Sequence, residues 1–264
     1  MSFNDKIKIA IDRLKIHQPV EGYYLAFSGG KDSCVLRALC DLGQIKYDAH
    51  YSVTTIDPPE LVRFIKEYWP ATQWDRQPVP FLKEFISRGA PRRQSRWCCA
   101  VYKEGGGEGR TVLTGLRWAE SPRRARDRKL FEVCYKGGGK KTLNPIIDWT
   151  ARDIWLFIGK YNVPYCSLYD EGKDRLGCLF CPMAKQRERD ADVKRYPGFV
   201  KAFKRAFGLL WEDRKTKDTA GIRNYESGNA FWDWWISGLS TKAWCKKTGR
   251  PYVKKEDWKK GGVK

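Results

Sequence analysis

Residues 28–33 read SGGKDS, and they directly follow an apolar run at residues 23–27. A strand that ends in glycines and leads into a helix presents backbone N–H groups at the helix N-terminus, where phosphates bind. Lys31 adds a positive charge for phosphate, and Ser28 and Ser33 add hydroxyl donors. The loop is therefore predicted to bind a ligand that carries phosphate groups.

This loop differs from the ordinary ATP-binding P-loop, G-x-x-x-x-G-K-[ST]. Leu25 stands where that pattern requires its first glycine, and Asp32 stands where it requires Ser or Thr. The sequence thus predicts a phosphate cup that is not a Walker A motif.

Four of the nine cysteines form two close pairs, Cys98-Cys99 and Cys178-x-x-Cys181. Cysteine thiolates bind iron–sulfur clusters and structural zinc, and the CxxC spacing lets two sulfurs reach one centre. A vicinal pair fits poorly on one tetrahedral zinc because neighbouring side chains diverge, whereas the corners of a four-iron cube are farther apart. The pattern favours an iron–sulfur cluster, with zinc as the alternative. Cys166 is a further candidate, and a site with three cysteines would leave one iron open.

Alternating strands and helices position these residues. Strands are predicted at residues 22–27, 47–55, 73–77, 111–116 and 130–135, and helices at residues 34–42, 60–68, 81–88 and 151–161. This alternation is typical of an α/β fold with a parallel five-stranded sheet and helices on both faces. After residue 164 the pattern becomes helical, so we expect a nucleotide-binding domain at 1–165 and a small helical C-terminal subdomain, containing cysteines and basic, at 166–264.

The composition limits the class of protein. The chain has 264 residues and a net charge of +20, which favours a polyanionic partner. Its N-terminus predicts an amphipathic helix rather than an export signal, and no stretch is apolar enough to span a bilayer. We therefore expect a cytoplasmic protein without disulfides, in which Cys34, Cys40 and Cys134 fill apolar faces.

The SGGKDS stretch resembles the SGGxDS loop of the PP-loop ATP pyrophosphatase superfamily, whose members cleave ATP between its α and β phosphates to adenylate a substrate. The resemblance implies an adenine nucleotide alpha hydrolase-like fold. It also implies that the whole loop cradles the pyrophosphate: Ser28, Gly29, Gly30, Lys31, Asp32 and Ser33. Lys31 and Asp32 would be catalytic, and Asp32 would help to hold Mg²⁺, which prefers a carboxylate together with phosphate oxygens.

Further motifs resemble the phosphoadenosine phosphosulfate (PAPS) reductase-like family over residues 22 to about 205: SVTTIDPPELVRFIKEYWP, GLRWAESPRR, NPIIDWTARDIWLFI and YDEGKDRLGCLFCPMA. The resemblance implies a second nucleotide or substrate loop formed by Gly115, Arg117, Glu120, Ser121 and Arg124, with Arg117 catalytic. The cysteines are also similar to those that hold a [4Fe-4S] cluster in assimilatory sulfonucleotide reductases. That similarity assigns the cluster to Cys98, Cys99, Cys178 and Cys181.

Two departures separate this chain from those reductases. Their phosphate loop is degenerate, whereas SGGKDS is intact, and their C-terminal nucleophile lies in an ECG-like motif that Cys245, in TKAWCKKTG, does not match. The sequence therefore favours the type that combines ATP with a cluster, namely the thiolation enzymes of tRNA and the DNA phosphorothioation protein. In that mechanism a nucleic-acid oxygen attacks the α-phosphorus, pyrophosphate leaves, and sulfide or persulfide displaces AMP.

The C-terminal residues support a nucleic-acid partner. Residues 241–264 carry a net charge of +7, and Trp244, Tyr252 and Trp258 lie among the basic residues. Positive charges follow a nucleic-acid backbone while aromatic rings stack on bases. We expect tRNA or DNA as the partner and a sulfur donor such as a cysteine desulfurase, and the sequence leaves an oligomer open.

Three alternatives stay open on sequence alone. They are a PAPS or adenylyl sulfate reductase, an enzyme like ATP sulfurylase, and a nucleotide- and nucleic-acid-binding module with a structural cluster. ATP turnover to AMP separates the module from the enzymes. The acceptor itself is not fixed by the fold.

Overall fold

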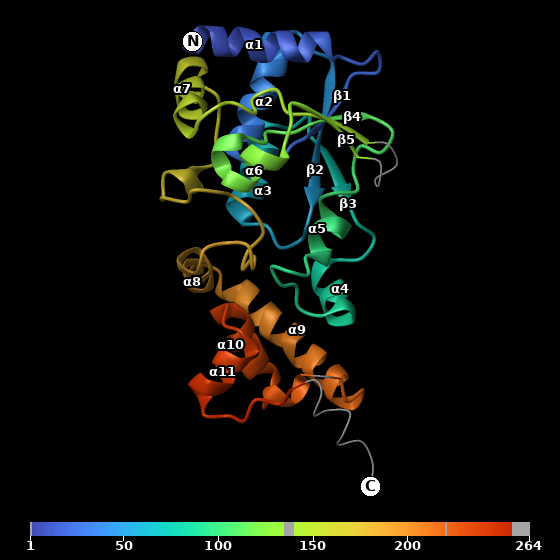
Figure 1. Cartoon of the computed structure of the whole chain (residues 1–264), viewed down its shortest axis with the longest axis vertical. Coiled ribbons are helices and arrows are strands. Elements are labelled where there is room, and N and C mark those ends of the chain that lie inside the picture. Colours follow the sequence, from blue (N-terminus) through green and yellow to red (C-terminus); the bar gives the residue numbers. More distant parts are fainter. Residues whose placement is uncertain (1, 135–139, 220, 255–264) are drawn as a thin grey trace. The chain divides into compact units, whose positions relative to one another are not determined.

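The computed structural model describes residues 2–134, 140–219 and 221–254. The chain forms two compact units, and each unit contains two segments of the chain (Figure 1). Unit 1 comprises Met1–Gln77 and Ala100–Gly177, and unit 2 comprises Pro78–Cys99 and Cys178–Lys264. The expected single boundary after residue 165 divides the chain differently, because residues 78–99 belong to unit 2 and residues 166–177 belong to unit 1.

Unit 1 contains a six-stranded sheet in the order β3-β2-β1-β4-β6-β5. The strands are β1 (Tyr23–Ala26), β2 (Tyr47–Val53), β3 (Gln73–Arg76), β4 (Thr111–Leu113), β5 (Phe131–Cys134) and β6 (Lys140–Leu143). All neighbouring strands pair in parallel except β5, which pairs antiparallel with β6 at the edge of the sheet. The predicted α/β fold is confirmed, but the sheet has six strands rather than five. Sequence analysis missed β6 because its sequence, KKTL, is polar and short.

Four helices of unit 1 bury apolar residues: α1 (Phe3–Ile16), α2 (Lys31–Leu42), α3 (Pro59–Tyr68) and α7 (Ala151–Tyr161). The short helices α6 (Pro122–Asp127) and η1 (Trp118–Glu120) bury no residue, and the 3-10 helix η2 spans Ser167–Tyr169. Leu36 and Leu39 of α2 are fully buried beside Tyr23 and Leu25 of β1 in one core. Thr150 caps α7, because its hydroxyl accepts a hydrogen bond from the backbone N–H of Asp153.

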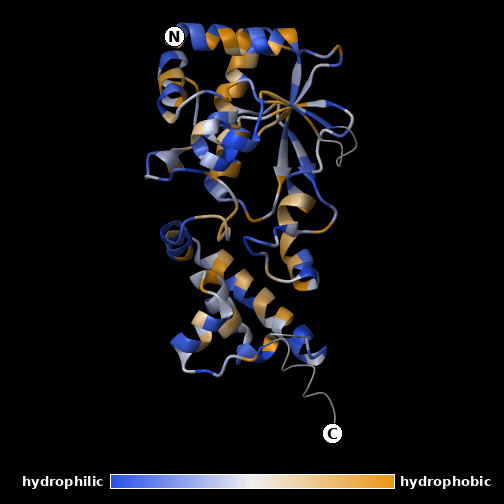
Figure 2. Cartoon of the chain, in the orientation of Figure 1, coloured by the Kyte–Doolittle hydropathy of each residue, from blue (hydrophilic) through white to orange (hydrophobic). Residues whose placement is uncertain are grey.

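Unit 2 is helical and has an aromatic core. Its elements are α4 (Phe81–Arg88), α8 (Gln186–Arg195), α9 (Pro197–Thr216), η3 (Ile222–Asn224), α10 (Gly228–Ser237) and α11 (Thr241–Thr248), while α5 (Trp97–Tyr102) crosses from unit 2 into unit 1. Phe85, Phe203, Phe207 and Trp232 are fully buried and contact one another or Trp235. Figure 2 shows apolar residues along α9 and α10, whereas α8 is almost entirely hydrophilic.

Within residues 2–134, 140–219 and 221–254, no helix combines the length and the apolar character that crossing a membrane would require.

Candidate functional site

The SGGKDS loop lies between β1 and the N-terminus of α2, as predicted. Gly29 has φ +68°, and a Cβ built there would lie 2.7 Å from the side chains of Leu61 and Ile65. Only glycine fits this position, because both the left-handed backbone and the close packing exclude a side chain. Gly30 is the N-cap of α2 and has no side chain to cap the helix. The N-terminal N–H groups of α2 therefore suit an anionic ligand.

The two serines of the loop hold its conformation. The Ser28 and Ser33 hydroxyls lie 3.2 Å apart, and the Ser33 hydroxyl donates to the Gly30 carbonyl at 2.8 Å. The Ser28 hydroxyl also accepts from the Gly30 N–H at 3.3 Å. These bonds fix the backbone of the cup without any ligand.

Lys31 is buried, with 7% of its surface exposed. Its backbone N–H donates to the Tyr169 hydroxyl at 3.0 Å, and its Nζ donates to the Asp174 carbonyl at 2.9 Å. The Nζ also lies 4.8 Å from the centre of the Tyr169 ring. Burial lowers the pKa of Lys31 below the ordinary 10.5, with Asp32 opposing this effect and Arg117 adding to it. An anion at this site would replace the solvation that the ammonium group has lost.

Arg117, which the sequence placed in a second loop, forms an ion pair with Asp32. Its Nε lies 2.6 Å from Asp32 Oδ1, and its guanidinium also donates to the Trp149 carbonyl at 3.3 Å. Gly115 allows this approach, because a Cβ there would lie 3.0 Å from the carbonyl carbon of Asp32. The structure thus brings the predicted catalytic residues Lys31, Asp32 and Arg117 together.

The rest of the second loop supports Arg117. Glu120 accepts from the Arg117 backbone N–H at 3.3 Å and pairs with Arg124. The Ser121 hydroxyl accepts from the Arg124 N–H at 3.2 Å and caps α6. Burial lowers the pKa of Arg124, and the positive charges of Arg175 and Arg117 contribute. Several cations are therefore gathered with few acids, which is the arrangement that a polyphosphate requires.

A pocket of about 390 Å³ opens at this position. It lies beyond the carboxyl ends of β1 and β4, where the strand order reverses direction and ligands bind in such sheets. Its lining residues are Lys31, Arg117, Glu120, Ala151, Trp155, Tyr169, Gly172, Lys173, Asp174 and Arg175. The volume is in the range of small-molecule sites.

Sequence analysis missed three residues of this pocket that could contact a ligand. Tyr169 and Arg175 both lie in the YDEGKDRLGCLFCPMA motif, and Trp155 lies in the NPIIDWTARDIWLFI motif. Trp155 is 39% exposed, and its ring packs edge-on against the Tyr169 ring with the ring centres 5.6 Å apart. Both motifs are evident in the sequence, but residue spacing alone does not show which of their side chains point into the pocket.

The four predicted metal ligands all belong to unit 2, and their thiols interact. Hydrogen bonding to Cys99 raises the pKa of the Cys98 thiol most strongly. Burial and the charges of Cys99, Cys178 and Cys181 act in the same direction. Deprotonating Cys98 is therefore unfavourable beside the other thiols unless a nearby cation compensates the charge.

The backbone between the CxxC cysteines is strained. Phe180 has φ +58°, which is rare for a bulky residue, and its side chain is fully buried. It packs at 5.1 Å from Phe203 and 5.5 Å from Trp232, and its N–H donates to Asp192 at 3.3 Å. This packing holds the turn that carries Cys178 and Cys181.

Within the described ranges, no three His, Cys, Asp or Glu side chains form a group that could hold one metal ion. A cube of four irons binds each sulfur at a separate corner, so its ligands lie farther apart than those of one ion. Cys98, Cys99, Cys178 and Cys181 lie near enough for their charges to interact, and a cluster held by these four thiols stays a prediction.

The other cysteines have different surroundings. Cys166 is fully buried in the apolar core of unit 1 and interacts with Cys34, so the structure does not place it among the four thiols of unit 2. Cys34 and Cys40 are buried fillers, as expected, while the side chain of Cys134 lies outside the described residues. Cys245 is 1% exposed and donates to Asn224 Oδ1 at 3.6 Å. None of the cysteines that the structure describes forms a disulfide.

The predicted nucleic-acid-binding tail is described only as far as residue 254, so Trp258 and its neighbouring lysines lie outside the described residues. Trp244 is buried, whereas Tyr252 is exposed. Among the aromatic residues of the tail that the structure describes, only Tyr252 exposes its ring to a large ligand.

The fold and the first pocket define a class of protein with a nucleotide-binding α/β fold. Residues 22–184 match the phosphoadenosine phosphosulfate reductase domain, and the chain belongs to that family. The fold is similar to that of a PAPS reductase from Candida auris solved as a phosphate complex, with a TM-score of 0.50 and 18% identity over 68% of this chain and 95% of that chain.

Relatives with similar sequences extend over different parts of the chain. An uncharacterized protein of Methanocaldococcus jannaschii is 27% identical over 84% of this chain and 45% of its own length. A second uncharacterized protein of that organism is 31% identical over 62% of this chain and 42% of its own length. An adenosine 5'-phosphosulfate reductase of Staphylococcus haemolyticus is 27% identical over 66% of this chain and 76% of its own length. The chain spans less than half the length of the two archaeal relatives.

Proposed function

We propose that the protein is an ATP-dependent adenylating sulfurtransferase that acts on nucleic acid and carries a [4Fe-4S] cluster. The observation that carries this proposal is the intact SGGKDS loop, in which Lys31 and Asp32 meet Arg117 at a pocket rich in cations. An enzyme that only binds a ready-made sulfonucleotide does not need a complete pyrophosphate loop, whereas an enzyme that cleaves ATP needs the complete loop to bind the leaving pyrophosphate.

In the proposed reaction an oxygen of the nucleic acid attacks the α-phosphorus of ATP, and pyrophosphate leaves. The N–H groups of the loop and of α2 would bind the β and γ phosphates, and Lys31, Arg117 and Arg175 would stabilise the charge on the leaving pyrophosphate. Asp32 positions Arg117 and would share Mg²⁺ with the phosphate oxygens. Sulfide then displaces AMP and takes the place of the activated oxygen.

Cys98, Cys99, Cys178 and Cys181 would hold the cluster. A cluster held by three of these four thiols would leave one iron open, and that iron could carry sulfide to an electrophile. The sulfur would come from a partner such as a cysteine desulfurase. The strained turn at Phe180 would keep Cys178 and Cys181 oriented when no cluster is present.

The runner-up is reduction of a sulfonucleotide, because named relatives are adenosine 5'-phosphosulfate reductases. The surroundings of Cys245 argue against that activity. This thiol is buried in α11 and bonded to Asn224, so it is not exposed as a nucleophile. The ATP sulfurylase-like alternative gives no role to the group of four thiols.

Pyrophosphate release tests the proposal. Protein purified and reconstituted without oxygen is incubated with ATP, Mg²⁺, sulfide and either tRNA or DNA, and both pyrophosphate and AMP are measured. Lys31→Ala should abolish release, whereas Lys15→Ala, an exposed lysine of α1, should not change it. If no nucleic acid supports release while adenylyl sulfate is reduced to sulfite, the reductase takes the place of this proposal.

The cluster has a separate test. The purified protein should absorb broadly near roughly 400 nm and contain iron and sulfide. Cys178→Ser should remove this absorbance, and Cys40→Ala, which changes a buried filler in unit 1, should keep it. A colourless wild-type protein with one zinc per chain contradicts the cluster.

A further inference from the structure

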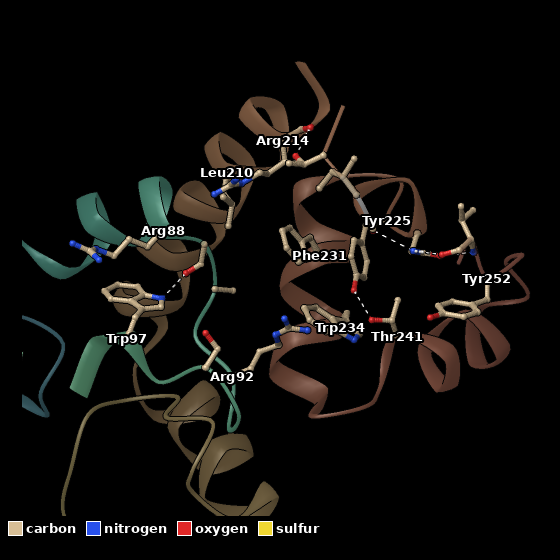
Figure 3. Close-up of a pocket in the computed structure, with 18 residues that line it drawn as sticks. Arg88, Arg92, Trp97, Leu210, Arg214, Tyr225, Phe231, Trp234, Thr241 and Tyr252 are labelled. Carbon is tan, nitrogen blue, oxygen red and sulfur yellow. Dashed lines mark hydrogen bonds between the residues drawn. The ribbon is translucent and has the colours of Figure 1, made fainter. Parts of the chain in front are cut away.

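Unit 2 contains two adjoining hollows that the nucleotide site does not use. Their volumes are about 420 Å³ and about 570 Å³, and both are lined by Arg92, Trp234, Thr241 and Tyr252. We call these two hollows together the basic trough. Figure 3 shows the first hollow, with Arg92 and Trp97 from the segment after α4 on one side and Tyr225, Phe231 and Trp234 on the other. Each volume is large enough for a ligand of nucleotide size.

The trough is positively charged. Its described lining residues include six cations and no Asp or Glu: Arg88, Arg92, Arg93, Arg189, Arg214 and Lys242. Some of them have partners inside the protein, such as Arg93, which donates to the Pro182 carbonyl at 2.8 Å. The exposed side chains of Arg92 and Lys242 form no ion pair with the part of the chain that the structure describes. These two are available for an anionic ligand.

The floor of the trough is aromatic. Tyr225 and Phe231 stack with their ring centres 4.6 Å apart, and Phe231 and Trp234 stack at 5.6 Å. Trp234 is only 7% exposed, and its indole N–H has no acceptor among the described residues. Buried donors are rarely left unpaired, so this N–H points to a ligand that brings an acceptor. Tyr252 is 42% exposed at the rim, so its ring has a face available for stacking.

We propose that the basic trough binds single-stranded nucleic acid at an unpaired nucleotide. The base stacks on Tyr252 and accepts a hydrogen bond from Trp234, while the flanking phosphates pair with Arg92 and Lys242. A duplex does not fit this chemistry, because its bases are stacked and paired and cannot present a face and an edge together. The biological role of this binding rests on the proposed function, because the strand bound in the trough is the acceptor of that reaction.

Fluorescence anisotropy with the full-length protein and no ATP tests this binding. The probes are fluorescein-labelled single strands of about 15 nucleotides, a length within the usual site sizes, as oligo(U) and oligo(dT), together with a mixed-sequence duplex of equal length. Both single strands should bind more tightly than the duplex, and their relative affinity distinguishes RNA from DNA. Tyr252→Ala should weaken binding about ten-fold, since one stacked base is lost. Tyr68→Ala, which removes an exposed tyrosine of unit 1, should have no effect.

Two more variants separate the contributions of charge and of the hydrogen bond. Arg92→Ala should weaken binding and reduce the salt slope by about 0.7, the value for one phosphate contact on a single strand. Trp234→Phe keeps an aromatic ring but removes the N–H, and it should weaken binding several-fold. Lys201→Ala, which removes an exposed cation of α9, is the matched control.

The inference is overturned if the duplex binds as tightly as the single strands, or if Tyr252→Ala and Arg92→Ala bind like the wild type. It is also overturned if AMP alone displaces the oligonucleotide from the trough at equal concentration. Failure here differs from failure of the proposed function. If Tyr252→Ala and Arg92→Ala bind the oligonucleotides like the wild type while pyrophosphate is still released, only the trough is rejected. If the wild type binds the single strands tightly but releases no pyrophosphate, only the adenylation is rejected.

Discussion

Replacing Asp32 by alanine should destabilise unit 1 as well as remove a catalytic group. Arg117 is buried, with 5% of its side chain exposed, and its closest charged partner is Asp32 at 2.6 Å. Without Asp32 the guanidinium keeps, among residues 2–134, 140–219 and 221–254, only its hydrogen bond to the Trp149 carbonyl. An arginine buried in this way cannot lose its charge to avoid the desolvation penalty.

The size of the effect follows from the burial of the two partners. Removing one partner of a fully buried ion pair costs about 3–5 kcal/mol. Asp32 is 21% exposed, so water already screens the pair, and we expect a loss of about 2–3 kcal/mol in the free energy of unfolding. Arg117→Met should cost less, about 1 kcal/mol, because Asp32 keeps Lys31 as a neighbour at 3.8 Å. The double variant should be more stable than the sum of the two losses predicts, with a coupling of about 1–2 kcal/mol.

Urea unfolding of the four proteins, followed by circular dichroism, measures this double-mutant cycle. Asp32→Asn is the matched control for side-chain volume, and it should fall between the wild type and Asp32→Ala because it retains an acceptor without the charge. The reasoning is refuted if Asp32→Ala unfolds at the same urea concentration as the wild type, or if the two single losses simply add.

Three further predictions concern the same pocket. Lys31→Met should keep or raise the stability of the nucleotide-free protein, because it removes a desolvated cation. The same variant should bind a non-hydrolysable ATP analogue at least ten-fold more weakly. Calorimetry measures the stability and the affinity, and an undiminished affinity would contradict the prediction. In the wild type, affinity for that analogue should fall as pH rises, and the fall should begin below pH 10.5, because the pKa of Lys31 is lowered. The contribution of Lys31 to the free energy of unfolding should rise with pH instead, because the unfolded state keeps the proton to a higher pH than the folded state does. Gly115→Ala should reduce pyrophosphate release strongly, because a Cβ would press on the Asp32 backbone at 3.0 Å, and a thermal melt within a few degrees of the wild type would show that the loss is local rather than global.

Much of the fold followed from local sequence patterns. The apolar strand, the glycine loop and the amphipathic helix after it were predicted within a few residues, because each has a strong periodic or steric signal. The strand β6 was missed, since its residues are polar and it lies beside an edge strand. The division into units was also not predictable, because the membership of residues 78–99 depends on tertiary packing of Phe81 and Phe85 with Phe203.

The candidate site was predicted to a similar degree. Residue types and spacing identified the loop, Arg117 and the two cysteine pairs. They did not reveal that Tyr169 supports Lys31, because 138 residues separate the two in sequence and only the folded chain brings them together. They also did not show that the indole N–H of Trp234, which is buried in α10, has no acceptor among the described residues.

The two-segment construction of unit 2 has a consequence for biosynthesis. Cys98 and Cys99 end its first segment, and Cys178 begins its second, so the ribosome adds 78 residues after Cys99 before it reaches the next thiol of the group. At ordinary elongation rates this takes about 4–16 s. During that time the first pair has no counterpart, and α9, on which α4 packs, has not been translated. The four thiols therefore assemble only late in translation, and the earlier pair is the one exposed to oxidants while the chain is still growing.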